Sequence, residues 1–223
     1  MTATAYSALI FDLDGTLIDS APDIAKAVNA CFAARGWPQL EVAYVESYIG
    51  NGPRRLIADI LVDRGLPSDP ETVDAAMKGY LDAYSQDPAG RCRLFDHVRE
   101  DLAALHGAGI RLGICTNKPH ELTARILDLL DLARYFDVAL GADAVPACKP
   151  DPGHLLAVAE AMQLEPGTYA YVGDTRVDQA TAQAAGIPFF VVPWGTGPGL
   201  EVPAQNRLSR LADLIAPTAV AAQ

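Results

Sequence analysis

Residues 7–17 read SALIFDLDGTL, an apolar run that ends in two carboxylates, a glycine and a threonine. Such a run predicts a buried strand over about residues 6–12, followed by a polar turn. Because side chains alternate along a strand, Asp12 and Asp14 can share one of its faces. Two like charges held this close are costly unless a cation or a proton neutralises one of them. The stretch therefore predicts a charged site at the end of the first strand. The alternative is an ordinary strand that ends in a polar turn.

The composition limits both the size and the partners of the protein. The chain has 223 residues, half of them hydrophobic, which is enough for one full-size domain or a domain with a small second unit. Its net charge of −11 argues against a general binder of nucleic acid or anionic membranes, since phosphate contacts need clustered lysines and arginines. A small phosphorylated partner is compatible, because it needs only a local positive site.

Cysteine and histidine usage predicts no structural zinc site. The four histidines are scattered, and so are the cysteines, none of which forms a Cys-x-x-Cys pair: Cys31, Cys92, Cys115 and Cys148. Reduced thiols in a cytoplasmic protein fit this pattern. We also expect no leader peptide, no membrane span and a loose tail from Ala216 onward.

Residues 22–85 contain no convincing strand and predict a bundle of helices. Ser20 and Asp23 have the spacing of a capping box at the first helix start, with Pro22 in the first turn. Apolar residues then recur at helical spacing at positions 57, 60 and 61, and at positions 73, 77, 80, 81 and 84. This region predicts a helical unit inserted after the first strand.

From residue 88 onward the pattern changes to alternating strands and helices. Strands are expected at residues 110–115, 136–140, 169–173 and 187–192, with helices near 96–107, 119–130, 149–162 and 175–186. This alternation implies parallel βαβ units with right-handed crossovers. We predict an α/β fold with a doubly wound, Rossmann-like parallel-sheet core at residues 1–18 and 88–223, and a small helical cap domain at residues 19–87.

Polar side chains follow the predicted strands at their carboxyl ends, where ligands bind in this class of fold. Asp12 and Asp14 follow the first strand, Thr116 follows the second, and Asp174 follows the fourth. Two or three carboxylates with few nitrogen ligands suit a hard cation such as Mg²⁺. A hydroxyl and a lysine suit an oxyanion, and an aspartate near a metal can be a nucleophile toward phosphorus.

Four motifs in this order resemble those of the haloacid dehalogenase superfamily. They are DLDGTL at residues 12–17, TNK at 116–118, KPDP at 149–152 and GDTRVD at 173–178. The helical insertion resembles the small cap of that superfamily. The chain is most similar to the phosphoglycolate phosphatase branch, through residues 11–20, YIGNG at 48–52 and residues 172–186, although LFDH at 94–97 stands where relatives often have a Tyr-Pro-Gly turn.

The resemblance implies a role for each catalytic position. Asp12 would attack phosphorus and carry it, and Asp14 would be the general acid and base. Thr116 would donate a hydrogen bond to the phosphoryl oxygens, and Lys149 would neutralise charge around them. The aspartate at position 14 argues for phosphoryl transfer over dehalogenation at carbon, since only phosphoryl transfer needs an acid for a leaving oxygen.

The resemblance also implies a magnesium site and phosphate donors. The metal residues would be Asp12, Asp14 through its backbone carbonyl, Asp174, and Asp178, which would act through water or hold Lys149. Backbone amides near Leu13 and Asn117 would contact the phosphate. For Lys118, a role in the site and an ordinary position on the surface both remain as alternatives.

Cap residues are the candidates for recognising the remainder of the substrate. Asn51, Arg54 and Arg55 lie at a predicted helix start, where they could meet a substrate carboxylate. The alternative for them is helix capping or a solvated helix face. A mobile cap would close over the substrate by bending near residues 18–19 and 88–90.

The sequence as a whole predicts a Mg²⁺-dependent phosphomonoester hydrolase that works through an aspartyl-phosphate, with 2-phosphoglycolate as the first substrate candidate. Alternatives are a related phosphatase for N-acetylmuramic acid 6-phosphate, a sugar phosphate or pyrophosphate, and a β-phosphoglucomutase-like phosphomutase. A non-catalytic binding protein on a retained fold is the rival from another class. The partner would be a small phosphorylated metabolite, and the protein a monomer or homodimer.

Overall fold

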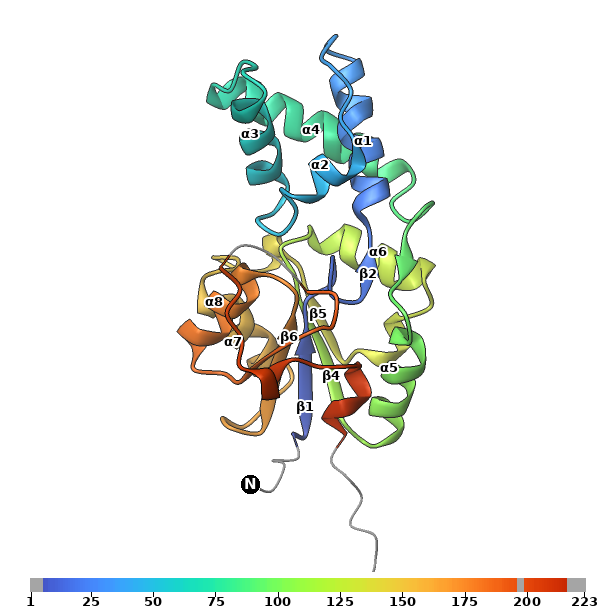
Figure 1. Ribbon diagram of the computed structural model, residues 1–223, viewed down its shortest axis with the longest axis vertical. Coiled ribbons are helices and arrows are strands. Elements are labelled where there is room, and N and C mark those ends of the chain that lie inside the picture. Colours follow the sequence, from blue (N-terminus) through green and yellow to red (C-terminus); the bar gives the residue numbers. More distant parts are fainter. Residues whose placement is uncertain (1–5, 196–198, 216–223) are drawn as a thin grey trace, which may run out of the picture.

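A computed structural model describes residues 6–195 and 199–215. The predicted tail from Ala216 lies outside these residues. The centre of the fold is a five-stranded parallel sheet (Figure 1). Its strands, in spatial order, are β5 (Val138–Leu140), β4 (Arg111–Cys115), β1 (Ala8–Phe11), β6 (Tyr169–Gly173) and β7 (Phe189–Val191).

Strand β1 occupies the middle of the sheet and is buried along its whole length. It pairs with β4 on one side and β6 on the other, so that Phe11 lies opposite both Ile114 and Val172. The chain winds outward from β1 in both directions, which places the topological switch point at its carboxyl end. Asp12 is the residue that follows.

Helices cover both faces of the sheet (Figure 1). One face carries α5 (Val98–Gly107) and α6 (His120–Leu129), and the other carries α7 (Pro152–Ala161) and α8 (Arg176–Ala185). Strand β1 serves both layers by alternation: Leu9 and Phe11 join one apolar cluster, and Ala8 and Ile10 join the other. Short 3₁₀ helices complete the core at Ala133–Tyr135, Ala142–Ala144, Ala204–Asn206 and Leu211–Leu214. The predicted α/β class is confirmed.

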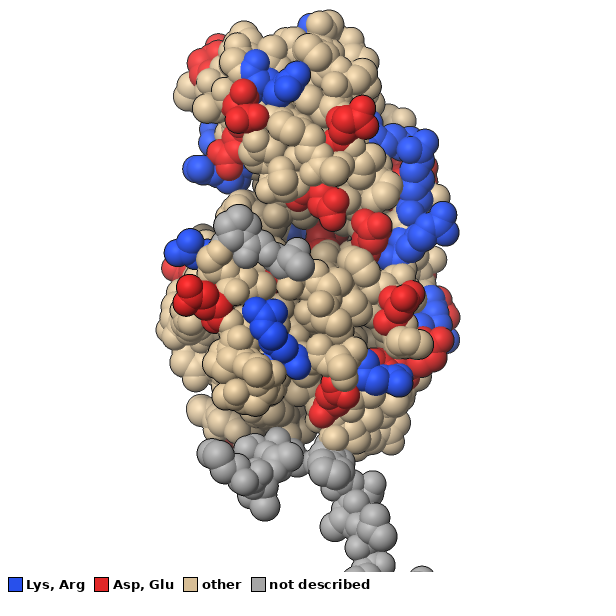
Figure 2. Space-filling model, viewed as in Figure 1, with Lys and Arg blue, Asp and Glu red and all other residues tan. Residues whose placement is uncertain are grey.

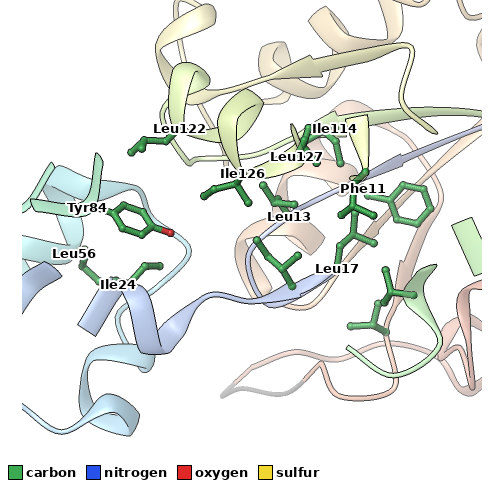
Figure 3. Packing of buried hydrophobic residues seen from close by; sticks show 14 of the residues in the cluster. Phe11, Leu13, Leu17, Ile24, Leu56, Tyr84, Ile114, Leu122, Ile126 and Leu127 are labelled. Carbon is green, nitrogen blue, oxygen red and sulfur yellow. The ribbon is translucent and has the colours of Figure 1, made fainter. Parts of the chain in front are cut away.

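Four helices form a separate layer beyond the carboxyl ends of the strands (Figure 1). They are α1 (Ala21–Ala33), α2 (Val42–Glu46), α3 (Pro53–Asp63) and α4 (Pro70–Gln86). We call this layer the cap. Figure 3 shows Ile24, Leu56 and Tyr84 of the cap near Leu13 and Ile126 of the core, all in one apolar cluster. The hydrophobic core therefore continues across the boundary between the two units.

The chain passes between cap and core along a short two-stranded ladder, β2 (Ile18–Asp19) and β3 (Arg93–Leu94). The first bending point was predicted at residues 18–19, where β2 lies. The second was predicted near residues 88–90, but these form a turn, and the strand that pairs with β2 begins at Arg93. Pro88 lacks the N–H that a ladder needs, which favours the turn.

The structure corrects two local predictions made from sequence spacing. Ser20 precedes α1, but its side chain makes no cap; its hydroxyl donates to Asp14 Oδ1 at 2.6 Å. The Asp23 carboxylate likewise accepts from the Arg91 backbone N–H instead of closing a capping box. Tertiary partners outweighed local pattern at each position.

Candidate active site

The core brings its polar strand ends together at the switch point. Asp12 follows β1, Thr116 follows β4 and Asp174 follows β6, and these three strands are neighbours in the sheet. The Asp12 backbone N–H donates to the Val172 carbonyl, which continues the β1–β6 ladder into the site. The side chains of Asp12 and Thr116 are buried. The predicted convergence of these residues is present in the fold.

Lys149 lies at the centre of the carboxylate cluster. Its Nζ is 2.9 Å from Asp12 Oδ1 and 2.7 Å from Asp178 Oδ1, and it also donates to the Tyr171 hydroxyl at 2.9 Å. Burial lowers the pKa of Lys149, but the charges of Asp12 and Asp178 outweigh burial and place that pKa above its ordinary value. The ammonium is therefore held in its charged form beside Asp12.

The hydrogen bonds of Asp178 explain what this residue does in the site. One carboxylate oxygen receives Lys149, with the Tyr171 hydroxyl 2.9 Å away, and the other accepts the Thr175 N–H and hydroxyl. Burial raises the pKa of Asp178, but Lys149 and these hydrogen bonds lower it below its ordinary value. Asp178 is thus an ionised anchor for Lys149, which matches one of its two predicted roles.

Three carboxylates form a group that could hold a cation. Among the residues that the structure describes, Asp12, Asp174 and Asp178 each offer an oxygen within 4.8 Å of the others. Burial, then the charge of Asp178, raises the pKa of Asp174 well above its ordinary value, and burial raises the pKa of Asp12 to about 6 despite Lys149. One ammonium does not balance three carboxylates. An all-oxygen donor set with this charge fits a hard divalent cation such as Mg²⁺.

Asp174 is held close to the turn after the first strand. Its Oδ1 accepts the Thr16 hydroxyl at 2.7 Å. Gly15 has a φ of +82°, and a Cβ there would lie 2.3 Å from Asp174 Oδ2. Glycine at this position therefore gives both the left-handed backbone and the room that Asp174 needs.

The hydrogen-bond partners of the Asp14 side chain differ from those of Asp12 and Asp174. Lys118 Nζ donates to both of its oxygens at 2.8 Å, and Ser20 donates to one of them. The Asp14 side chain is therefore outside the three-carboxylate group, in keeping with the prediction that it would reach a metal only through its backbone carbonyl. Sequence reasoning left Lys118 undecided, and the only signal for it was its place in the TNK motif.

Asn117 connects three segments of the site. Its amide group donates to the Gly50 carbonyl in the cap and to the Lys149 carbonyl in the core, both at 2.9 Å. Gly52 approaches so closely that a Cβ there would lie 3.3 Å from the Asn117 carbonyl oxygen. The Asn117 side chain thus positions the cap loop against the Lys149 loop.

A small pocket, partly open to solvent, lies between cap and core at Asp12. Its core side consists of Asp12, Asp14, Thr116, Asn117, Lys118 and Pro119. Its cap side is mostly apolar and consists of Ile24, Ile49, Gly50, Gly52, Pro53, Leu56, Tyr80 and Tyr84. The space has charged groups on one wall and hydrocarbon on the other, as ligand pockets commonly do.

The predicted cap residues are placed unequally. Asn51 lines a wider cleft that continues from the pocket past Asp14, Asp19 and Asp174. Figure 2 shows acidic side chains gathered at this junction of cap and core. The structure does not bring Arg54 or Arg55 to the pocket: both are exposed on α3 and pair with the nearby cap residues Asp74 and Asp59. They follow the alternative of a solvated helix face.

The comparisons with known proteins agree with this site. The family model for haloacid dehalogenase-like hydrolases matches residues 9–192. A phosphoglycolate phosphatase of Cereibacter sphaeroides is 39% identical over 84% of this chain and 85% of its own length. Another, from Vibrio parahaemolyticus, is 34% identical over 98% of this chain and its entire length.

Solved structures show the same architecture. A crystal structure of a predicted phosphoglycolate phosphatase from Haemophilus somnus superposes with a TM-score of 0.81 at 27% identity, covering 95% of this chain and 97% of its own. A haloacid dehalogenase superfamily hydrolase from Geobacter sulfurreducens gives 0.69 at 26% identity, covering 96% and 98%.

The chain belongs to the haloacid dehalogenase-like hydrolases, and within them it is a phosphoric monoester hydrolase. Its sequence is similar to that of the phosphoglycolate phosphatases. Among the described residues, no helix is both long and apolar enough to cross a membrane.

Proposed function

We propose that this protein hydrolyses 2-phosphoglycolate to glycolate and phosphate through an aspartyl-phosphate on Asp12. The observation that carries the proposal is the buried pair of Asp12 and Lys149, with Asp14 on the same pocket wall. Asp12 Oδ1 is close to the ammonium but makes no hydrogen bond within the described part of the chain. Such an oxygen is held in place and still has a lone pair for phosphorus.

The reaction has two steps. In the first, an Asp12 oxygen bonds to phosphorus, the bond from phosphorus to the ester oxygen breaks, and that oxygen takes a proton from Asp14. In the second, water attacks phosphorus, Asp14 takes a proton from the water, and the bond from phosphorus to Asp12 breaks to give phosphate. Lys149 and Thr116 stabilise negative charge on the phosphoryl oxygens in both steps.

Asp12, Asp174, the backbone carbonyl of Asp14, and Asp178 through water would hold a Mg²⁺ ion. When bound, Mg²⁺ neutralises charge on the phosphoryl group and on the carboxylates that approach it. The chain's own part is to hold these oxygens close together. We infer Mg²⁺ because the donors are oxygens and the cluster has excess negative charge.

The choice of substrate rests on the pocket and on the relatives. Apolar cap residues line one side of the pocket, and the space beside Asp12 is large enough for a small phosphorylated molecule. Relatives named phosphoglycolate phosphatase are 34% to 39% identical to this chain. The four free cysteines fit a reducing compartment, and we propose a cytoplasmic location. Assembly as a monomer or homodimer stays a prediction.

The substrate is tested by kcat/KM with Mg²⁺ for 2-phosphoglycolate beside N-acetylmuramic acid 6-phosphate, hexose phosphates and pyrophosphate. We expect 2-phosphoglycolate to lead by about a hundredfold, which is about 2.7 kcal/mol of transition-state discrimination. If another compound has the highest kcat/KM, the proposed phosphatase reaction is kept and 2-phosphoglycolate is not the preferred substrate. Phosphate release that requires a bisphosphate activator would instead indicate a phosphomutase.

The nucleophile is tested by Asp12→Asn. We expect kcat to fall by at least about a thousandfold, because an amide oxygen is a poor nucleophile and forms no aspartyl-phosphate. Asp59→Asn is the matched control, since Asp59 pairs with Arg55 on the cap surface, and it should keep wild-type rates. Wild-type kinetics in Asp12→Asn would rule out Asp12 as the nucleophile.

A further inference from the structure

Lys118 is a buried cation for which the proposed reaction has no role. Its side chain is 2% exposed, and its Nζ lies 4.8 Å from the centre of the Tyr84 ring. Among the described residues that line the pocket, it is the one lysine or arginine. A second negative group on a substrate bound there would therefore meet Lys118.

The present partner of Lys118 is the proposed acid and base. Three donors, two from Lys118 and one from Ser20, occupy the carboxylate of Asp14. These donors take three of about four acceptor positions of the carboxylate, so Lys118 and Ser20 set its orientation. Lys118 cannot lose its ion pair with Asp14 without a replacement, because an unpaired buried ammonium is strongly unfavourable. Release of Asp14 thus requires another anion for Lys118.

Tyr84 provides a second, independent sign of a ligand. It lines the same pocket from α4 of the cap, it is buried, and its hydroxyl has no hydrogen-bond partner among the residues that the structure describes. Figure 3 shows its ring extending from the cap with the hydroxyl toward the core. A buried hydroxyl without a partner costs free energy that a bound acceptor would recover. The pocket therefore has an ammonium and a hydroxyl available to one anionic group.

We propose that Lys118 and the Tyr84 hydroxyl bind the substrate's second anionic group, a carboxylate one carbon from the ester oxygen, and that this exchange releases Asp14. The inference rests on the proposed function, because it requires the phosphoryl group to lie at Asp12. The exchange replaces one carboxylate by another beside Lys118, so the local charge balance is kept. A substrate with a neutral tail leaves Asp14 paired and reacts slowly.

The test compares pairs of phosphomonoesters that differ in the carboxylate: 2-phosphoglycolate with ethyl phosphate, and 3-phosphoglycerate with glycerol 3-phosphate. We expect the wild-type protein to prefer one carboxylate member by about a hundredfold in kcat/KM. Lys118→Met should reduce that preference to less than about fivefold, mainly by slowing the anionic member, and Tyr84→Phe should reduce it about tenfold. Lys78→Met, which removes an exposed lysine from α4, should leave it unchanged.

The outcomes separate this inference from the proposed function. Equal losses on both members of a pair in Lys118→Met would mean that Lys118 only supports the structure, and would overturn the inference while 2-phosphoglycolate remained the substrate. A Lys118-dependent preference within the glycerate pair alone would overturn both the proposed substrate and the one-carbon spacing, and would keep only Lys118 as the binding group for a substrate carboxylate. No carboxylate preference in the wild-type protein would overturn it outright. If Lys118→Met fails to fold by circular dichroism, an unchanged preference in Tyr84→Phe overturns it.

Discussion

Lys149 and His154 lie close in sequence, but Lys149 is charged and His154 is neutral. Lys149 stays charged because two carboxylates contact it, whereas His154 lies buried without an acidic partner. His154 Nε2 is 3.2 Å from the Leu140 carbonyl, so Nε2 carries the proton. Nδ1 has no hydrogen-bond partner in residues 6–195 and 199–215. Burial, then the charge of Lys149, lowers the pKa of His154 to about 4. The histidine is thus a neutral core residue, as expected of a residue with a packing role.

His154 should make the stability of the protein depend on acid. Its folded pKa of about 4 is below the unfolded value, so the unfolded chain binds the proton first as pH falls. Stability is therefore fully present above about pH 6.5, and we expect about 3 kcal/mol to be lost by about pH 4.

Urea unfolding of the wild-type protein and of His154→Gln across this range measures the effect. The glutamine variant should lack this part of the slope, which reaches about 1.4 kcal/mol per pH unit. Parallel stability curves for the two proteins would contradict the pKa assignment.

At the scale of the element, the start of α8 links a helix cap to the site. Thr175 and Asp178 form a capping box, and the same Asp178 carboxylate holds Lys149. A local device that begins a helix therefore also positions the ammonium beside Asp12. The α4 helix begins with Asp69, whose carboxylate accepts the Thr72 N–H at the surface. The N-terminal cap of α8 is part of the site, and the N-terminal cap of α4 is not, so the two helix starts can be compared directly.

Thr175→Ala should cost about 1 kcal/mol of stability through the lost cap, and about tenfold in kcat because Asp178 loses a donor that fixes it. Asp69→Ala should cost a similar amount of stability with no change in kcat. Thermal unfolding and steady-state kinetics of both variants give the answer. If both variants keep wild-type kcat, the capping box does not support the site.

At the scale of the whole molecule, cap and core share apolar contacts but are joined by only a narrow ladder. The β2–β3 pair carries the two connections, and the pocket with Asp12 opens between the units. We propose that the cap moves about this ladder, and that residues 1–18 with 88–223 and residues 19–87 are the two domains. Asp23, which accepts the Arg91 N–H, ties both connections together on the cap side.

The excess of negative charge in the core predicts how the whole protein responds to metal. Mg²⁺ should stabilise the folded state, because the unfolded chain does not assemble Asp12 and Asp174. Its affinity should fall as pH decreases through about 6, since burial places the pKa of Asp12 at about 6 and that of Asp174 well above its ordinary value.

Titration calorimetry in two buffers of different ionisation enthalpy should show proton release on Mg²⁺ binding near pH 6. Asp174→Asn should weaken binding, and Asp137→Asn, at an exposed pair with Arg111, should not. Binding that is independent of pH between 5.5 and 7.5 would contradict the metal site.

The sequence alone determined the fold class and most of the candidate site. Alternating apolar segments fixed the parallel sheet, and the polar residues at the strand ends predicted that Asp12, Thr116 and Asp174 would meet. These features follow from local patterns, since hydrophobic period selects the element and parallel strands align their carboxyl ends.

The partners of the charged side chains follow from the three-dimensional packing and could not be read from the sequence. Lys118 binds Asp14 across the chain, Asp23 binds Arg91 instead of capping its helix, and Arg54 points to Asp74 on the cap surface. Sequence spacing gives the face of a helix only coarsely, and it does not say which distant segment packs there. Charged side chains take the partners that burial and packing leave within reach, and those partners lie far away along the chain.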